Sequence, residues 1–118
     1  MIKATFTLYD EIRYLRFVVK GHAGENVKGH DIVCASASIL LYTLAQTVDD
    51  MEQHGELTAD PIVEMDEGDA LITCHCNSDE AYTKAVTAFK TIWTGYTLLA
   101  HEYPQYVELT YVGKADKA

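Results

Sequence analysis

The spacing of the apolar residues changes several times along the chain, and the order of these changes restricts the possible folds more than any other feature. Apolar and polar side chains alternate in five stretches, as in strands buried on one face: residues 2–8, 12–20, 57–65, 70–76 and 105–112. In two longer stretches, apolar residues recur every three or four positions, as in amphipathic helices. The predicted order is β-β-α-β-β-α-β, which favours an α+β fold. We expect a mostly antiparallel five-stranded sheet with two helices packed on one face.

Capping and breaking residues predict where the two helices begin and end. Asp31 is a good N-cap for the first helix, which is expected to run to about His54 because Gly55 can end it. Asn77 can cap the second helix, and Pro104 blocks its continuation.

Length and composition favour a single small enzyme or binding domain. The 118 residues predict one domain over 1–112 and a frayed tail over 113–118. The net charge of −9 disfavours direct nucleic-acid binding and would attract a basic polypeptide, although many acidic proteins have no such partner. The N-terminus reads as a strand rather than a signal peptide, and no apolar run is long enough for a membrane span. We therefore expect a cytoplasmic protein without a membrane partner.

The segment 21–34 carries the most chemical information. It places His22 in a glycine-bounded loop and Cys34 in the first turn of the predicted helix. The unpaired N–H groups and partial positive charge of a helix start favour a thiolate there. A nearby imidazole can hold that thiolate and later donate a proton, so the pair predicts a cysteine hydrolase. Backbone N–H groups near Val33 and Cys34 are candidates to stabilise an oxyanion.

Structural alternatives to this interpretation remain open. A cysteine such as Cys34 is often only a small buried residue, and a loop histidine such as His22 is often only solvated. The small residues that follow Cys34, up to Ser38, leave space that a substrate groove would need. His30 is a weaker candidate partner for the thiol. Asp31 has a sufficient structural role as a cap, and orienting His22 is a second possible role.

The segment Cys74-His75-Cys76 has a weak resemblance to a metal site. Both thiols lie on the predicted core face of their strand, and the histidine points the other way. Without a second thiol pair or a histidine pair, zinc binding is disfavoured. We expect no metal and no cofactor, and we expect all three cysteines to be reduced thiols.

The residues of segment 21–38 resemble the signature of the bacterial ribosomal-processing cysteine protease family, Prp. The matching positions are Gly21-His22-Ala23, Gly29, Asp31-Ile32-Val33-Cys34-Ala35 and Ser38. The resemblance implies a homodimeric α+β enzyme that removes a short N-terminal extension from a large-subunit ribosomal protein during ribosome assembly. It also implies that Cys34 is the nucleophile, that His22 is its partner, and that the loop 23–30 moves to admit the peptide.

Two other classes of function compete with the protease interpretation. A non-catalytic binding module or chaperone for a basic ribosomal protein would retain its function without Cys34 or His22. A thiol redox sensor would need a resolving thiol, and the two other cysteines are predicted to lie in the core.

Overall fold

A computed structural model describes residues 1–22, 30–66 and 68–113. Five strands and two long helices make up this part of the chain. The strands are β1 (Ile2–Tyr9), β2 (Tyr14–Lys20), β3 (Val63–Asp66), β4 (Asp69–His75) and β5 (Val107–Gly113). The helices are α1 (His30–Gln53) and α2 (Asp79–Glu102), and a 3-10 turn, η1 (Asp10–Ile12), joins β1 to β2.

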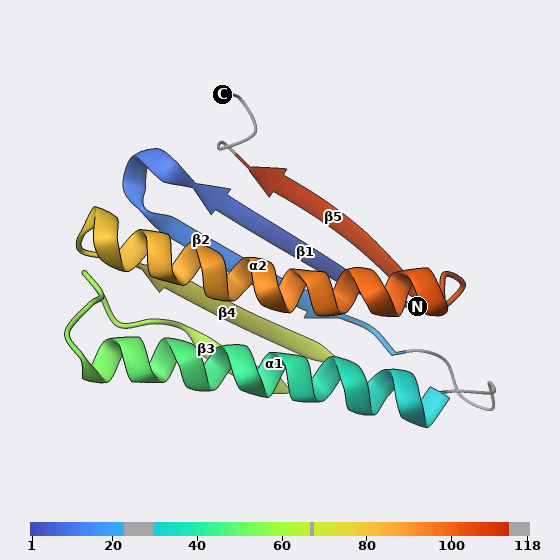
Figure 1. The fold of residues 1–118 in the computed structure, drawn as a ribbon. Helices are drawn as coiled ribbons and strands as arrows, with labels where there is room; N and C mark the ends of the chain where they lie inside the picture. The colour runs from blue at the N-terminus through green and yellow to red at the C-terminus, as the bar shows by residue number, and fades with distance from the viewer. Residues whose placement is uncertain (23–29, 67, 114–118) are drawn as a thin grey trace.

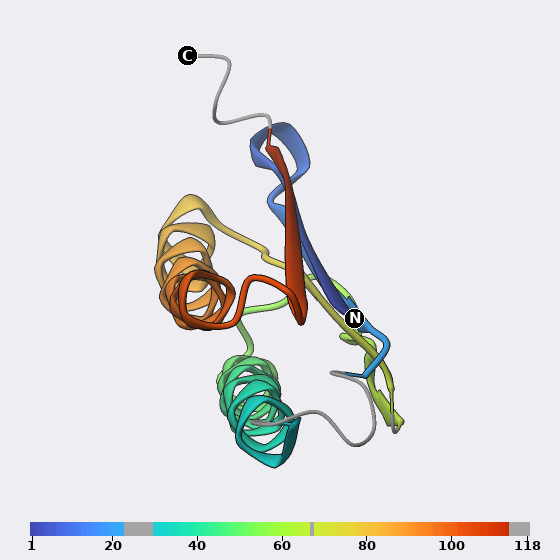
Figure 2. The same ribbon diagram turned by 90° about the vertical axis from the view of Figure 1, so that its right-hand side faces the viewer.

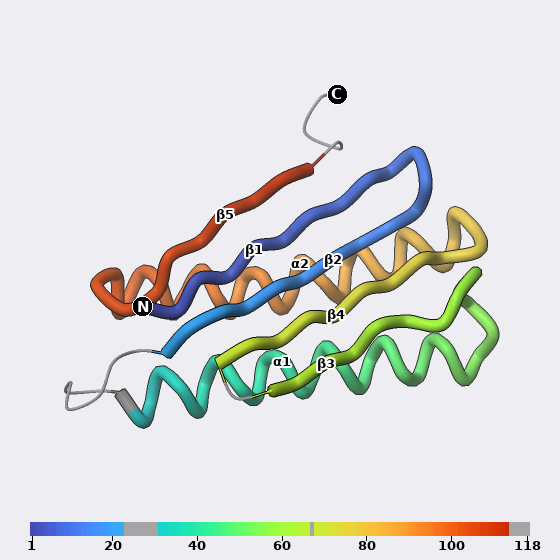
Figure 3. Tube along the Cα trace, turned by 180° about the vertical axis from the view of Figure 1, so that it is seen from behind, coloured from blue at the N-terminus to red at the C-terminus, as the bar shows by residue number. Residues whose placement is uncertain are grey.

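The strands form one sheet in the order β3-β4-β2-β1-β5. Three neighbouring pairs are antiparallel, and β1 pairs with β5 in parallel. Both helices cover the same face of the sheet, as the two side views show (Figures 1 and 2). Seen from behind, no described element covers the other face (Figure 3). The predicted α+β architecture is therefore confirmed, and the parallel pair refines it.

An aromatic cluster fills the core between the sheet and α2. The ring of Phe6 lies 6.0 Å from that of Phe17 and 5.9 Å from that of Phe89. The ring of Phe17 lies 5.3 Å from that of Tyr96. Alternation along β1 and β2 directs Phe6 and Phe17 toward the helices, as the sequence pattern predicts.

Several predicted boundaries are wrong by a few residues. The second strand begins at Tyr14 rather than residue 12, because η1 takes up Ile12 and is followed by Arg13, which has a positive φ of 54°. Before β3, only Leu57 forms a bridge, to Cys76, in the stretch 57–62 that was expected to be strand. Ser78, not Asn77, caps α2, since its side chain accepts a hydrogen bond from the Ala81 N–H at 3.0 Å. Asn77 instead donates to the Gly55 carbonyl at 2.7 Å.

Helix α1 also begins earlier than the sequence predicts. Asp31 is its second residue and Cys34 its fifth, so Asp31 is not the N-cap and Cys34 lies in the second turn. By length and composition alone, Asp31–Gln53 is apolar enough to cross a membrane, with a mean hydropathy of 1.4. One face of α1 is nevertheless buried against the sheet, through residues such as Val33, Leu44 and Val48. A core helix of this kind passes the same test.

The topology brings three segments that are distant in sequence to one end of the molecule. Strand β2 ends, β4 begins and α1 begins at this end (Figure 1). Lys20, the last residue of β2, pairs in register with Asp69, the first residue of β4. A site between the sheet and α1 can therefore draw side chains from all three.

Candidate active site

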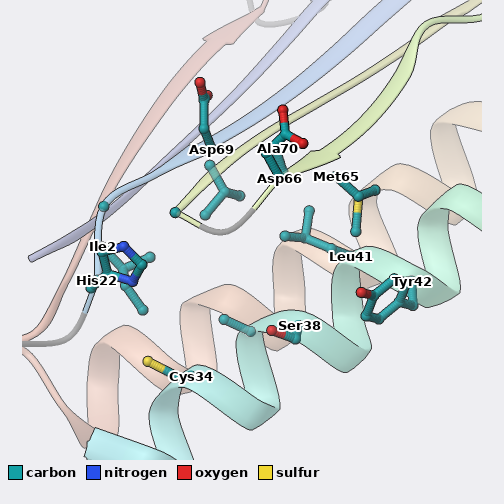
Figure 4. Close-up of a pocket in the computed structure, with 14 residues that line it drawn as sticks. Ile2, His22, Cys34, Ser38, Leu41, Tyr42, Met65, Asp66, Asp69 and Ala70 are labelled. Carbon is teal, nitrogen blue, oxygen red and sulfur yellow. The ribbon is translucent and has the colours of Figure 1, made fainter.

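Cys34 lies on the side of α1 that faces the end of the sheet. Ser38 and Tyr42 follow it at intervals of four residues, so the three side chains lie along one side of the helix. Cys34 is partly exposed, and its sulfur points from α1 toward the strands (Figure 4). The structure therefore does not bury this thiol in the core, which was the structural alternative for Cys34.

His22 follows the end of β2, and its side chain is exposed. The preceding residue, Gly21, has a φ of +94°, and a Cβ there would lie 2.2 Å from the carbonyl oxygen of Met1. Only glycine fits this close approach. The backbone nitrogen of Met1 also donates a hydrogen bond to the carbonyl oxygen of His22. The position of His22 is therefore held by its backbone at the edge of the sheet.

His22 and Cys34 line the same pocket, which has a volume of about 400 Å³. Figure 4 shows the imidazole on the strand side and the thiol on the helix side of this space. Polar and apolar side chains both line the space between them, and the two acidic residues of the lining are Asp66 and Asp69. The apolar part of the lining includes Ile2, Val19, Ala37, Leu41, Met65 and Ala70. This arrangement can hold an extended peptide segment with its backbone between a thiol and an imidazole.

Other residues predicted for the site have mixed outcomes. Gly21 and Ser38 line the pocket, whereas Asp31 is exposed and is not among the lining residues. Val33 is fully buried in the core and does not line the pocket. Ala23, Gly29 and the expected moving loop lie outside the described residues, as does the side chain of His30.

The early start of α1 changes the expected oxyanion donors. In an α-helix, each N–H pairs with the carbonyl four residues earlier, and only the first four N–H groups lack such a partner. The N–H of Cys34 therefore faces the His30 carbonyl inside the helix. The expectation that this amide stabilises an oxyanion stays a prediction, and the position of Cys34 in α1 favours N–H groups nearer the helix start as donors.

Cys74 and Cys76 form a separate, buried pair that does not line this pocket. Their exposed fractions are 0% and 2%, and their sulfurs lie 3.7 Å apart. The hydrogen bond with Cys76 and burial raise the pKa of the Cys74 thiol. Among the described residues, no group of three or more His, Cys, Asp or Glu side chains is arranged to hold a metal ion. Cys74 is therefore a core thiol that stays protonated.

The β3–β4 turn is a part of the site that the sequence analysis missed. Asp66, Gly68 and Asp69 line the pocket from this turn, and Tyr42 lines it from α1. The sequence gives a turn signal at this position but no sign that the turn meets segment 21–34. That proximity arises from the pairing of β2 with β4, which joins residues about 50 positions apart.

Comparison with known proteins identifies close counterparts of this fold. A model of the cysteine protease Prp family matches residues 1–108. The crystal structure of the essential ribosomal processing protease Prp from S. aureus, in complex with a covalently linked product peptide, is 27% identical with a TM-score of 0.66. That match covers 94% of this chain and 99% of the other.

Two further structures share the fold. SMU.848 from Streptococcus mutans is 27% identical with a TM-score of 0.65, over 97% of this chain and 96% of that one. The S. aureus protease in complex with a substrate peptide matches at 24% identity with a TM-score of 0.66, over 94% and 99% of the two chains. A search of curated proteins gave no match.

Proposed function

Because this chain belongs to the cysteine protease Prp family, we propose that it removes a short N-terminal extension from a large-subunit ribosomal protein, using Cys34 and His22. The chain is a cysteine protease by its family, and a similar S. aureus protease is described as a ribosomal processing protease. The observation that carries the assignment of residues is the shared pocket. A partly exposed thiol and an exposed imidazole line it from opposite sides.

The reaction proceeds by acyl transfer through a thioester. The Cys34 thiolate attacks the scissile carbonyl carbon, and the carbonyl electrons move to the oxygen. When the tetrahedral intermediate collapses, the C–N bond breaks and the protonated imidazole of His22 gives its proton to the leaving amine. The neutral imidazole then takes a proton from water, and the resulting hydroxide equivalent attacks the thioester. The new carboxyl end leaves, and the thiol is restored. These steps use only protein groups and water.

The apolar residues of the pocket lining and the charge of the protein support a peptide substrate of this kind. Leu41 and Met65 offer apolar surface in the same pocket as the thiol, which suits a peptide with apolar side chains. A net charge of −9 attracts a basic ribosomal protein and repels nucleic acid. We therefore propose that the enzyme meets its substrate in the cytoplasm as a polypeptide, without direct contact to RNA.

We also propose that the enzyme acts as a homodimer. Ile32, Ile39 and Tyr42 are 59%, 62% and 58% exposed. They lie on one side of α1, away from the core, because they are seven and three residues apart. Exposed apolar side chains gathered on one face of a helix are typical of association surfaces. Tyr42 also lines the pocket, so this surface adjoins the site.

The experiment that tests the function uses a recombinant ribosomal protein that carries an N-terminal extension. We expect the wild-type enzyme to produce the shortened protein, as measured by intact mass spectrometry. Cys34→Ala should give no product, because it removes the nucleophile. His22→Gln should lower kcat/KM by roughly 10²- to 10⁴-fold, the usual contribution of general acid–base catalysis.

The matched control is His75→Gln, since His75 lies on β4 away from the pocket lining. It should cleave at the wild-type rate. Equal cleavage by Cys34→Ala and wild type would rule out the mechanism. Tight binding of the ribosomal protein without cleavage by any variant would favour the chaperone alternative.

A further inference from the structure

The imidazole of His22 lies directly over Gly68, in the turn between β3 and β4. A Cβ placed on Gly68 would lie 2.4 Å from Nε2 of His22, 2.8 Å from Cε1 and 3.2 Å from Cδ2. Contacts below 3 Å are not tolerated between such atoms, so the ring occupies the space that any other residue would fill. Gly68 itself lines the pocket beside His22.

Contacts at Gly68 and at Asp69 fix this part of the turn relative to the end of β2. The Gly21 N–H donates to the Gly68 carbonyl at 2.9 Å. Lys20 pairs in register with Asp69, and their side chains form an ion pair at 3.5 Å. Because both residues are largely exposed, the ion pair adds little stability, and the backbone hydrogen bond and strand pairing hold the register. The surface under the imidazole is therefore part of the sheet, not of an independent loop.

We propose that Gly68 is a positioning residue for the cleavage reaction: its missing side chain forms the seat that keeps the His22 imidazole directed toward Cys34. This inference rests on the proposed function of His22 and Cys34, and it adds a residue of the β3–β4 turn to the residues that support the cleavage reaction. Gly68 supplies no reacting atom. It acts by leaving the space that the imidazole ring of His22 occupies.

The exposure of His22 determines which property a side chain at position 68 would damage. An exposed imidazole can rotate away from a new Cβ at little cost in folding free energy. The fold would then remain intact while the ring is displaced from its catalytic position. A misplacement of about 1 Å in a reacting group can lower the rate about 100-fold. The predicted defect is therefore catalytic rather than structural.

Gly55 provides a matched control for the backbone conformation of Gly68. The two glycines have φ values of +70° and +73°, a region that disfavours most side chains. No atom outside its own neighbours lies within 4 Å of a Cβ built on Gly55. Asparagine tolerates this backbone conformation better than other residues. Gly68→Asn and Gly55→Asn thus share the backbone change, and only the first meets the imidazole.

The test measures kcat, KM and urea denaturation for the wild type and both variants, with the extension-bearing ribosomal protein as substrate. We expect the two denaturation midpoints to shift alike. Gly68→Asn should lower kcat about 100-fold with little change in KM, and Gly55→Asn should keep wild-type kcat. The NMR signals of the His22 ring should move in Gly68→Asn alone.

The remaining outcomes also decide whether the proposal holds. Wild-type kcat in Gly68→Asn, with the wild type active, would overturn the role of Gly68 and leave the proposed function standing. An inactive wild type would instead overturn the proposed function. If Gly68→Asn does not fold, the change is repeated with His22→Ala: folding in that background supports the seat, and failure there overturns it.

Discussion

The hydroxyl group of Tyr96 joins α2 to α1 beside the pocket. It donates a hydrogen bond to the carbonyl oxygen of Ala37 at 2.7 Å, and the side chain has no exposed surface. Burial raises the pKa of this hydroxyl, so it stays a neutral donor. Ala37 lines the pocket on the same helix as Cys34. The bond therefore supports the wall that carries the nucleophile.

Removing this hydroxyl should destabilise the protein measurably. We expect Tyr96→Phe to lower the free energy of unfolding by about 1 kcal/mol, the usual net value of a buried hydrogen bond. Tyr42→Phe is the control, because the side chain of Tyr42 is 58% exposed, and it should change stability by less than about 0.5 kcal/mol. Urea denaturation measures both. Equal stability of the two variants would show that the bond contributes nothing.

The sequence can propose individual site residues where neighbouring residues suggest a chemical role. A thiol near a helix start and a histidine after a glycine made Cys34 and His22 candidates, and the resemblance to the Prp family assigned their roles. The structure places both at one pocket. No neighbouring residue in the sequence suggests such a role for Gly68. Its importance depends on an imidazole 46 residues earlier in the chain, and only the β2–β4 pairing brings the two together.

At the level of elements, Ser78 illustrates how a helix start is fixed. Its side chain accepts a hydrogen bond from the Ala81 N–H at 3.0 Å, and Asp79 and Glu80 lie in the first turn of α2. These carboxylates interact favourably with the positive end of the helix dipole. The start of α2 sets the register of its buried residues, including Phe89 and Tyr96, against the sheet.

Loss of this cap should weaken α2. We expect Ser78→Ala to lower the free energy of unfolding by about 1 kcal/mol. Thr91→Ala, in the exposed middle of α2, is the control and should be neutral or slightly stabilising, because alanine has the higher helix propensity. Chemical denaturation distinguishes them. A stability loss no larger in Ser78→Ala than in Thr91→Ala would contradict the cap assignment.

The order of the helices and strands could be predicted from hydrophobic periodicity, whereas the residues at which they begin could not. The stripe of α1 begins only at Val33, so the pattern could not reveal that the helix already includes His30. Two adjacent candidates, Asn77 and Ser78, can each cap α2, and tertiary contacts decided between them. Asn77 is used to bind the Gly55 carbonyl, which leaves Ser78 as the cap.

At the scale of the whole molecule, the helices lie on one face of the sheet. The side of α1 that points away from the core carries three exposed apolar residues, Ile32, Ile39 and Tyr42. Ile39 is the most exposed of the three apolar residues on that side of α1. In the proposed homodimer each copy carries a net charge of −9, so apolar contact would have to overcome repulsion between the copies. Because Ile39 is the most exposed of the three, we expect a charged side chain at this position to disrupt the proposed apolar contact.

We expect Ile39→Lys to shift the protein from dimer to monomer, as measured by light scattering after size-exclusion chromatography. Leu98→Lys is the control, since Leu98 is 65% exposed on the other helix, and it should remain dimeric. A wild-type protein that is monomeric at micromolar concentration would contradict the dimer. A dimeric Ile39→Lys variant would place the contact elsewhere.

The central claim is that the thiol of Cys34 and the imidazole of His22 act together across one pocket. This claim is tested by the rate at which iodoacetamide alkylates Cys34. The rate is measured by peptide mapping at a series of pH values, for the wild type and for His22→Gln. We predict that Cys34 of the wild type reacts faster at neutral pH, because the imidazole accepts its proton, and that the two rates converge at alkaline pH. Identical profiles for the two proteins at every pH would contradict the account.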